Sequence, residues 1–440
     1  MISYLQKHSF CSAQISEPSN PRVNIIVVIP CFNEPDLISS LESLWKCSRP
    51  QCDVEVIVVI NASKNSSPEI ILQNEKSFEE SNHWIENNSD DSLRIFLIKN
   101  NSLPEKHAGV GLARKIGMDE AVRRFANVNN KDGLIVCFDA DSTCEKNYLV
   151  EIENHFKKFP HSPGCSIYFE HPVFRPETFA EEISGIPKVD PKINEGIIQY
   201  ELFLRYYRQG LKFAGHPFSF HTIGSSMAVR ADAYCKQGGM NKRKAGEDFY
   251  FLQKIFALGN FSEINSTCVI PSPRPSLRVP FGTGRAINDF IEKKEEFIQA
   301  YHPETFVDLK KFCERIPELA EIENFKDGFD PLPHSIKKFL LANDFEKNFR
   351  EIKKNSSSAE MFLKRFYRWF DGFRVLKFVH FVRDQHTKNT NETGFNGFPE
   401  IQIAEAAKKL LVMKKNLIEK RDYFTFDLLD IYRQMDKAKT

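Results

Sequence analysis

Two runs of β-branched and apolar residues near the N-terminus constrain the fold more than any other feature of the sequence. They cover residues 23–29 and 54–60, and neither alternates apolar with polar side chains. Such continuous runs are typical of strands buried on both faces, as in a parallel sheet covered by helices. A helical pattern over residues 36–45 lies between them. The segment therefore predicts a βαβ unit.

The same alternation continues to about residue 150. Residues 94–98 and 134–138 are expected to form strands, with a helix at 109–125 between them. This order predicts an α/β fold with a doubly wound, mostly parallel sheet, which binds ligands at the carboxyl ends of its strands. From about residue 286 the chain is instead charged, rich in Phe and helical in pattern. We expect a separate C-terminal helical region there.

Two acidic residues, Asp139 and Asp141, follow the predicted strand 134–138 directly. Because positions i and i+2 of a strand face the same side, their carboxylates can lie together where the sheet opens to ligand. Two like charges at this spacing need compensation, and Mg²⁺ or Mn²⁺ would supply it and bridge to a diphosphate. An Asx-turn after the strand explains the same residues without any ligand. The pair by itself leaves both interpretations open.

Several motifs, taken in order, make residues 22–285 resemble the family 2 glycosyltransferases. Each motif is loose by itself, but the order and spacing are specific. They are Val28-Ile29-Pro30-Cys31-Phe32-Asn33-Glu34, Ala113-Arg114-Lys115-Ile116-Gly117, the acidic pair, Gly224-Ser225-Ser226-Met227-Ala228-Val229-Arg230, Gly238-Gly239-Met240 and Gly246-Glu247-Asp248. The resemblance implies a GT-A fold, in which a Rossmann-like nucleotide half is joined to an acceptor half.

The resemblance also implies the reaction, a transfer of a sugar from a nucleotide-sugar donor to an acceptor hydroxyl with inversion at the anomeric carbon. Asp248 would be the general base, with Glu247 beside it in the catalytic motif. Asp139 would lie near the ribose and the metal, and Asp141 would ligate Mn²⁺ or Mg²⁺. The nucleotide-sugar would further contact Pro30, Phe32, Asn33, Glu34 and, at the base or phosphates, Arg114.

Asp248 directly precedes an apolar helical pattern, so it is expected at a helix N-terminus. The helix dipole would favour its ionised form, ready to accept a proton. The alternative is a plain N-cap, and the two roles are compatible.

Two features depart from the family pattern. Asn61 stands after the second strand where the family usually has an acid that reads the base; its amide can accept from a pyrimidine or donate to another base. A UDP-sugar is therefore favoured, and a GDP-sugar stays open. A Pro- and Arg-rich loop, 271–285, replaces a His after the catalytic helix. Arg274 and Arg278 in it would cover the diphosphate, unless the loop is only a surface crossover between domains.

These assignments define the expected domains. They are an N-terminal tail at 1–21, a glycosyltransferase domain at 22–285 with a nucleotide-binding half at 22–145 and an acceptor half at 146–285, and a helical region at 286–440. His216 and His221 precede Gly224, where the family places the acceptor pocket, and either could contact a saccharide or lipid-linked acceptor. Two loop histidines with ordinary hydrogen bonds are the alternative.

Composition adds exclusions. A net charge of +1 from 60 basic and 59 acidic residues gives no field that would favour nucleic acid. We see no signal peptide, membrane-spanning run or CxxC pair among the ten cysteines, so a cytoplasmic protein with reduced thiols is expected. Residues 362–382 mix aromatic and basic side chains; they could contact a membrane surface from the inside or, alternatively, pack against the catalytic domain.

Other functions remain as alternatives. A sugar-1-phosphate nucleotidyltransferase also uses a nucleotide, a metal and a related sheet. Such an enzyme should have a Gly-rich basic loop after the first strand, which this sequence lacks. A non-catalytic module that binds nucleotide-sugars would not need the acids at 139, 141, 247 and 248. A retaining GT-A transferase uses the same scaffold with the opposite stereochemistry.

Overall fold

The structure is a computed structural model, and it describes residues 1–88, 90–175, 190–276, 282–293, 296–323, 325–387, 395–415 and 423–438. The chain divides into two compact units. The first comprises Met1–Phe174, Thr222–Asn288 and Asp436–Thr440, and the second Arg175–His221 and Asp289–Met435. The functional domain boundaries expected from the sequence stay a prediction, because compactness does not assign function.

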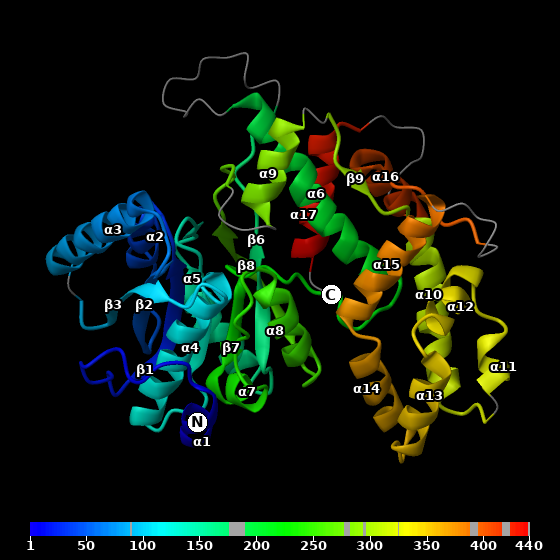
Figure 1. Ribbon diagram of the computed structural model, residues 1–440, viewed down its shortest axis with the longest axis horizontal. Helices are drawn as coiled ribbons and strands as arrows, with labels where there is room; N and C mark the ends of the chain where they lie inside the picture. The colour runs from blue at the N-terminus through cyan, green and yellow to red at the C-terminus, as the bar shows by residue number, and fades with distance from the viewer. Residues whose placement is uncertain are drawn as a thin grey trace. The chain divides into compact units, whose positions relative to one another are not determined.

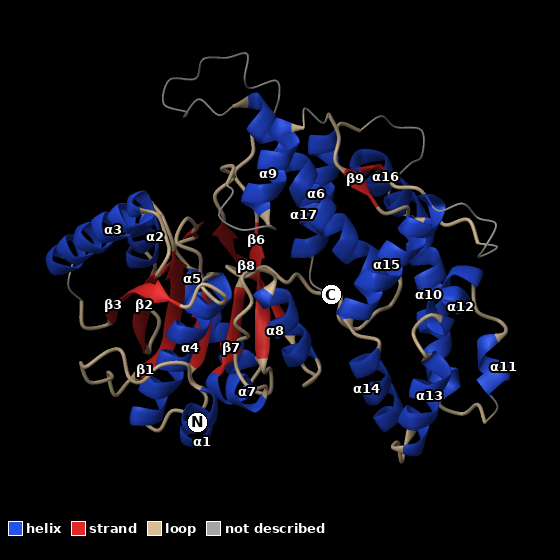
Figure 2. Cartoon of the chain, viewed as in Figure 1, coloured by secondary structure: helices blue, strands red, loops and turns tan. Residues whose placement is uncertain are grey.

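The first unit is built on an eight-stranded mixed sheet with the strand order β3-β2-β1-β4-β7-β6-β8-β5 (Figure 2). Strands β1 to β4 are parallel, whereas β7 is antiparallel to both of its neighbours. The strands are β1 (Val23–Cys31), β2 (Asp53–Ser63), β3 (Leu93–Leu103), β4 (Leu134–Cys137), β5 (Thr143–Cys144), β6 (Gly164–Phe169), β7 (Met227–Arg230) and β8 (Ser262–Ile270). The predicted α/β class is therefore confirmed.

Helices cover this sheet. They are α1 (Ile2–His8), α2 (Leu37–Trp45), α3 (Pro68–Asn87), α4 (Val110–Asn127), α5 (Tyr148–Lys158), α7 (Ala231–Lys236) and α8 (Glu247–Phe256). The backbone of α4 comes close to β1 and β2, because Gly117 has no side chain and a Cβ there would overlap Val28 and lie 3.1 Å from Val59. Figure 1 shows α4 lying across these strands. The apolar β1 and β2 runs are buried, as the sequence predicted.

The N-terminal segment is held on α4 by buried polar groups. Tyr4 and Tyr234 both donate to Asp119 Oδ1, at 2.7 and 2.8 Å, and Lys115 lies 3.0 Å from Asp119 Oδ2. The backbone N–H of Phe10 also donates to Asp119. Burial and the charge of Asp119 both raise the pKa of Tyr4, which keeps its hydroxyl protonated as a donor. Tyr4 and Phe10 of the N-terminal segment are therefore held against α4.

The second unit is mainly helical. Its elements are α6 (Pro191–Phe213), α10 (Glu304–Leu319), α11 (Phe325–Phe329), α12 (His334–Leu341), α13 (Phe345–Lys354), α14 (Ala359–Trp369), α15 (Gly372–Thr387), α16 (Ile403–Met413), β9 (Gln299–Ala300) and β10 (Ile401–Gln402). Helices α9 (Thr283–Glu292) and α17 (Thr425–Lys437) each contain a boundary between the units. The helical C-terminal portion was predicted, whereas the sequence did not group α6 with it.

Aromatic side chains fill the interior of this second unit. The ring centroids of Phe312 and Phe370 are 5.1 Å apart, and those of Phe345 and Trp369 are 5.2 Å apart. In the stretch 362–382, the buried aromatic residues are Phe362, Phe366, Trp369, Phe370 and Phe378. These rings pack among helices of their own unit instead of forming an exposed aromatic face. In the described part of the chain, no helix has the length and apolar character that crossing a membrane requires.

Candidate active site

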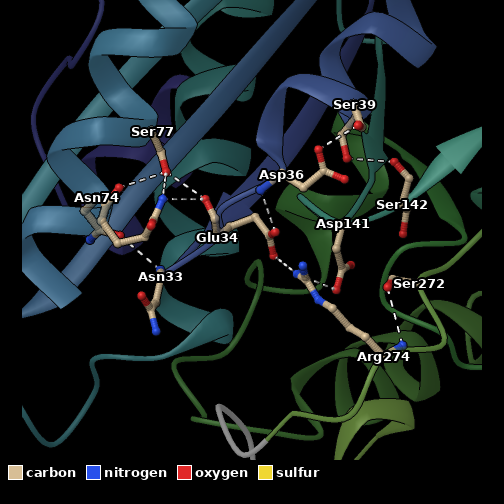
Figure 3. Close-up of polar contacts among 12 residues, drawn as sticks. Asn33, Glu34, Asp36, Ser39, Asn74, Ser77, Asp141, Ser142, Ser272 and Arg274 are labelled. Carbon is tan, nitrogen blue, oxygen red and sulfur yellow. Dashed lines mark hydrogen bonds and ion pairs between the residues drawn. The ribbon is translucent and has the colours of Figure 1, made fainter. Parts of the chain in front are cut away.

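The loop after β1 is fixed by side chains of α3. Asn33 has a positive φ of 49°, a conformation that Asn tolerates better than most residues. Its N–H donates to Asn74 Oδ1 at 3.0 Å, and the carbonyl of Glu34 accepts from Ser77 Oγ at 2.7 Å (Figure 3). Asn74 Nδ2 also donates to the carbonyl of Asn61, at 3.0 Å. Asn74 therefore joins the ends of β1 and β2, where Asn33, Glu34 and Asn61 were predicted to meet the nucleotide.

The carboxylate of Glu34 is 1% exposed and takes part in two further contacts. Oε1 accepts from the N–H of Asp36 at 3.0 Å, and Oε2 accepts from Arg274. Pro30, at the end of β1, and Phe32, directly after it, are both partly exposed. The predicted nucleoside residues thus come from one continuous turn, in which Glu34 faces Arg274.

Arg274 lies in the loop after β8 and bridges two acidic residues. Besides Glu34, its Nη2 reaches Asp141 Oδ2 at 3.4 Å (Figure 3). Burial opposes its charge, but Glu34 and then Asp141 outweigh that effect and raise the pKa of Arg274. The structure thus brings Arg274 together with one acid of the predicted pair. Arg278 lies outside the described residues.

Arg114, near the start of α4, makes a second bridge. Its Nη2 donates to Asp139 Oδ1 and its Nη1 donates to Glu247 Oε1. The side chain is 3% exposed. Burial opposes its charge, but Asp139 and Glu247 together raise the pKa of Arg114. The guanidinium therefore links the acidic pair to the motif at 246–248, a contact that the sequence analysis did not foresee.

Two glycines, Gly224 and Gly111, make room for this bridge. A Cβ at Gly224 would lie 2.6 Å from Arg114 Cζ, so only glycine lets the backbone pass the guanidinium at this distance. A Cβ at Gly111 would lie 2.9 Å from the Cβ of Glu247. Gly224 and Gly111 thus allow the close approach of three segments around one arginine.

Glu247 and Asp248 open α8. Gly246 takes the N-cap position with a φ of 67°, so the interpretation of Asp248 as an N-cap is wrong; Asp248 lies in the first turn of the helix. Its Oδ1 accepts from the N–H of Phe249 at 2.7 Å. Burial raises the pKa of Asp248, while Arg114 opposes the shift. Burial likewise raises the pKa of Glu247 to about 7 against the opposing charge of Arg114.

The side chains of the acidic pair remain partly open. Asp139 is 36% exposed and Asp141 is 27% exposed. In the described part of the chain, no group of three or more His, Cys, Asp or Glu side chains is arranged to hold a metal ion. Two carboxylates without a third protein ligand still suit Mg²⁺ or Mn²⁺, since Mg²⁺ is commonly bound by one or two carboxylates together with substrate phosphates.

The two histidines predicted to contact the acceptor both belong to the second unit. His216 is 2% exposed, and its Nε2 lies 3.0 Å from the carbonyl oxygen of Phe370. Burial lowers the pKa of His216 to about 4, although that contact partly offsets it. His216 is therefore a neutral, packed residue in this structure. His221 is partly exposed.

Comparison with known proteins gives a match to one segment of the chain, which contains part of this site. Residues 26–234 match the family model described as glycosyl transferase family 2. The match contains Glu34, Arg114, Asp139 and Asp141, and it ends before Asp248. A comparison with curated protein sequences gave no match.

Solved structures with a similar course of the chain include S. aureus TarS 1-349 in complex with UDP-GlcNAc, at 12% identity and a TM-score of 0.38, covering 79% of this chain and 91% of that one. The same fragment in complex with UDP is 13% identical with a TM-score of 0.37, and the match covers 79% and 92% of the two chains. The whole of S. aureus TarS is 14% identical with a TM-score of 0.34, over 82% and 55%.

Proposed function

We propose, from the match of residues 26–234 to the family model of glycosyl transferase family 2, that the chain moves a sugar from a nucleotide-sugar donor to an acceptor hydroxyl with inversion. The observation that carries the proposal is the position of Asp248. It stands in the first turn of α8, next to Glu247, which Arg114 joins to Asp139 of the acidic pair. A proton acceptor and the donor-binding acids thereby belong to one connected group.

Asp248 would act as the general base. As the acceptor oxygen attacks the anomeric carbon, the bond from that carbon to the diphosphate oxygen breaks and the acceptor proton passes to Asp248. Its raised pKa makes it a stronger base than an ordinary aspartate, which favours proton transfer late in the displacement. Arg114 and Glu247 touch neither reacting atom in this scheme; they fix the start of α8 against α4.

The leaving diphosphate would be held by cations at the acidic pair. Asp139 and Asp141 are the residues that would hold Mn²⁺ or Mg²⁺, and the metal would neutralise the charge that develops on the diphosphate. Arg274 would turn from Asp141 toward a phosphate oxygen, because its guanidinium pairs equally well with phosphate and carboxylate. Arg278, which follows it in the chain, would assist.

The turn at residues 30–34 and Asn61 would form the nucleoside site. Pro30 and Phe32 supply partly exposed apolar surface, and Asn33 supplies an amide. Asn61 is 2% exposed, so the base that it reads would have to approach a largely enclosed side chain. We favour uracil, with guanine as the other candidate, because an amide can either accept or donate a hydrogen bond.

The acceptor side of the proposal is broader, with a saccharide or a lipid-linked saccharide as the acceptor. We propose a cytoplasmic site of action. Contact with a membrane through residues 362–382 would have to use the basic side chains and the partly exposed Phe373 and Phe381, since the other phenylalanines of the stretch are buried. His221, which is partly exposed, suits an acceptor contact better than the buried His216.

A thermal-shift panel tests the donor class. UDP, GDP and dTDP are each added with and without Mn²⁺, and binding to the folded state raises Tm. We expect stabilisation by UDP that increases with Mn²⁺. No stabilisation by any of the nucleotides with metal would contradict the proposed function.

Asp248→Asn tests the base. It should abolish transfer and leave the stabilisation by nucleotide unchanged, whereas loss of both would assign Asp248 a structural role only. Stereochemistry is read from the first sugar released by slow hydrolysis of the donor, using proton NMR. An anomer opposite to that of the donor is expected; the same anomer would favour a retaining enzyme.

A further inference from the structure

Two thiols meet in the first unit, and one of them stands three residues after Asp141 in the chain. Cys47 follows the C-terminal end of α2, and Cys144 lies in the short strand β5. Their sulfur atoms are 3.6 Å apart, although the residues are 97 positions apart in the chain. All ten cysteines of the protein are free thiols. Cys47 is 4% exposed and Cys144 is partly exposed.

The surrounding contacts hold both thiols in place. The N–H of Cys144 donates to Ser43 Oγ at 2.8 Å, and the thiol of Cys47 donates to the carbonyl of Ser43 at 3.4 Å. Two more hydrogen bonds join the same two segments of the chain. Ser40 Oγ donates to the carbonyl of Ser142 at 2.7 Å, and the N–H of Ser48 donates to the carbonyl of Lys146 at 2.7 Å. The segments on which the two sulfurs lie are therefore fastened together on either side of the pair.

We propose that Cys47 and Cys144 are a site of reversible oxidation, at which a hydroperoxide such as H₂O₂ joins them in a disulfide. The thiolate of one cysteine attacks a peroxide oxygen, the O–O bond breaks, and a sulfenic acid and one water form. The second thiol then attacks that sulfur, the S–O bond breaks, and a second water leaves. The two sulfurs lose two electrons in total, and the peroxide takes them up.

The contact between the thiols favours this chemistry. The hydrogen bond from Cys144 lowers the pKa of the Cys47 thiol, which increases the share of the reactive thiolate. An S–S bond is about 2.05 Å long, so the sulfurs must approach by roughly 1.5 Å. Exposed residues stand next to both cysteines in the chain, Ser48 beside Cys47 and Glu145 beside Cys144, and rotation of the two side chains can provide part of this movement.

The disulfide would affect the candidate active site because both cysteines lie on segments that continue into that site. Cys144 stands three residues after Asp141, and β5 pairs with β8, which leads to Arg274. At the other end, α2 begins at Leu37, directly after the turn that carries Glu34. The bond would thus join the segments that hold the bridge of Arg274 to Glu34 and Asp141. This consequence rests on the proposed function, whereas formation of the bond does not.

Peptide mapping tests the site itself. The full chain is treated with H₂O₂, remaining thiols are alkylated, and the digest is analysed by mass spectrometry. We expect a Cys47–Cys144 linked peptide that dithiothreitol releases. It should persist in Cys235→Ser, which removes a partly exposed thiol elsewhere, and vanish in Cys144→Ser and in Cys47→Ser. Oxidised protein that retains its circular dichroism but contains no such peptide would overturn the proposal.

Nucleotide titration tests the consequence. UDP with Mn²⁺ is titrated into reduced and oxidised protein by calorimetry, and we expect affinity to fall on the order of tenfold on oxidation, as small displacements of binding groups are costly. Cys144→Ser should show no such change. Equal affinity of the two forms would refute the effect on the site. Absence of binding to the reduced protein would instead contradict the proposed function and leave the result of the mapping intact.

Discussion

Arg114 and Arg274 each bridge two carboxylates of the first unit, but they do so in different surroundings. Arg114 is 3% exposed and joins Asp139 to Glu247, whereas Arg274 is 33% exposed and joins Asp141 to Glu34. Arg114 stands on α4, a helix packed on two strands; Arg274 stands in a loop beyond β8. The two acids of the predicted pair are thus divided between a buried and a half-buried arginine.

The difference in burial indicates different roles for the two arginines. Removing one partner from a buried group of charges leaves the others uncompensated in the low-dielectric interior. Separating Arg114 from its carboxylates would therefore cost a large free energy. A half-exposed arginine loses less, because water replaces the lost partner. Arg274 can therefore exchange a carboxylate for a phosphate during a reaction cycle, whereas Arg114 serves to hold the geometry.

The largest effect is expected for Arg114→Met, which keeps much of the side-chain volume and removes the charge. Glu247 and Asp139 would lose their common partner, so the free energy of unfolding should fall by about 3–5 kcal/mol. Misplacement of α8 should lower transfer at least about a hundredfold. Denaturant unfolding and steady-state rates measure the two effects. Arg350→Met, whose side chain is 71% exposed and pairs with the exposed Glu346, is the control and should change both little.

If Arg114→Met proved as stable as the parent, the bridge would not stabilise the fold, and the proposed difference in role between Arg114 and Arg274 would be wrong. Loss of transfer at unchanged stability would instead assign Arg114 a direct contact with the donor, as the resemblance alone had implied.

Arg274→Met should show the opposite pattern. One charge-assisted contact to a phosphate is worth roughly 1.5 kcal/mol, so the affinity for UDP should weaken about tenfold. The free energy of unfolding should fall by less than in Arg114→Met, because only one of the two carboxylates, Glu34, is buried, whereas Asp141 is 27% exposed. Calorimetric titration and denaturant unfolding give both values, with the exposed Arg243 changed to Met as control. A large loss of stability with unchanged affinity would remove the distinction between the two arginines.

The sequence predicted the elements of this site better than their connections. Asp139 and Asp141 could be predicted because they follow a recognisable strand pattern, and Asp248 because it directly precedes a helix pattern. That Arg114 joins Asp139 to Glu247 depends on how α4, the loop at Gly224 and α8 pack together, and no local pattern encodes that packing. Asn74 gave no signal either, since a polar residue within a helix usually faces water; its burial follows only from the meeting of α3 with the ends of β1 and β2.

The second unit shows the same limit. The helical character of the C-terminal portion follows from composition and pattern, and it was predicted correctly. The sequence could not show that α6 groups with these distant helices. Gly210 of α6 lies against Phe306 of α10, with its missing Cβ only 2.7 Å from that ring, and such a contact between separated segments leaves no periodic signature. Contacts between residues distant in the sequence could therefore not be predicted from local sequence patterns.

A pH profile provides a smaller but more specific test of the comparison. The base must be ionised, and burial raises the pKa of both Asp248 and Glu247, the latter to about 7. Transfer should therefore rise with pH, on a limb that lies above the range of an ordinary carboxylate. Arg114 lowers both pKa values, so its loss in Arg114→Met should move this limb to higher pH. Arg274→Met should leave the limb in place, because Arg274 faces Glu34 and Asp141 instead.

Residual rates of the variants suffice for this measurement, since only the midpoint is compared. Arg114→Lys keeps the charge without the two-pronged geometry and should therefore lower the rate while shifting the limb less than Arg114→Met. Equal shifts in the Lys and Met variants would show that geometry, not charge, sets the pKa of the base.

A further, small effect concerns the support behind Arg114. Lys115 and Asp119 follow Arg114 on α4, and Tyr4 of the N-terminal segment donates to Asp119. Tyr4→Phe removes two buried hydrogen bonds, one donated to Asp119 and one accepted from Lys115, so the free energy of unfolding should fall by about 1–2 kcal/mol, measured by denaturant unfolding. Asp119→Asn, which removes the charge opposite Lys115, should cost more. If the pH limb of transfer also moved in Tyr4→Phe, the N-terminal segment would help to position Arg114; an unmoved limb would confine its role to stability.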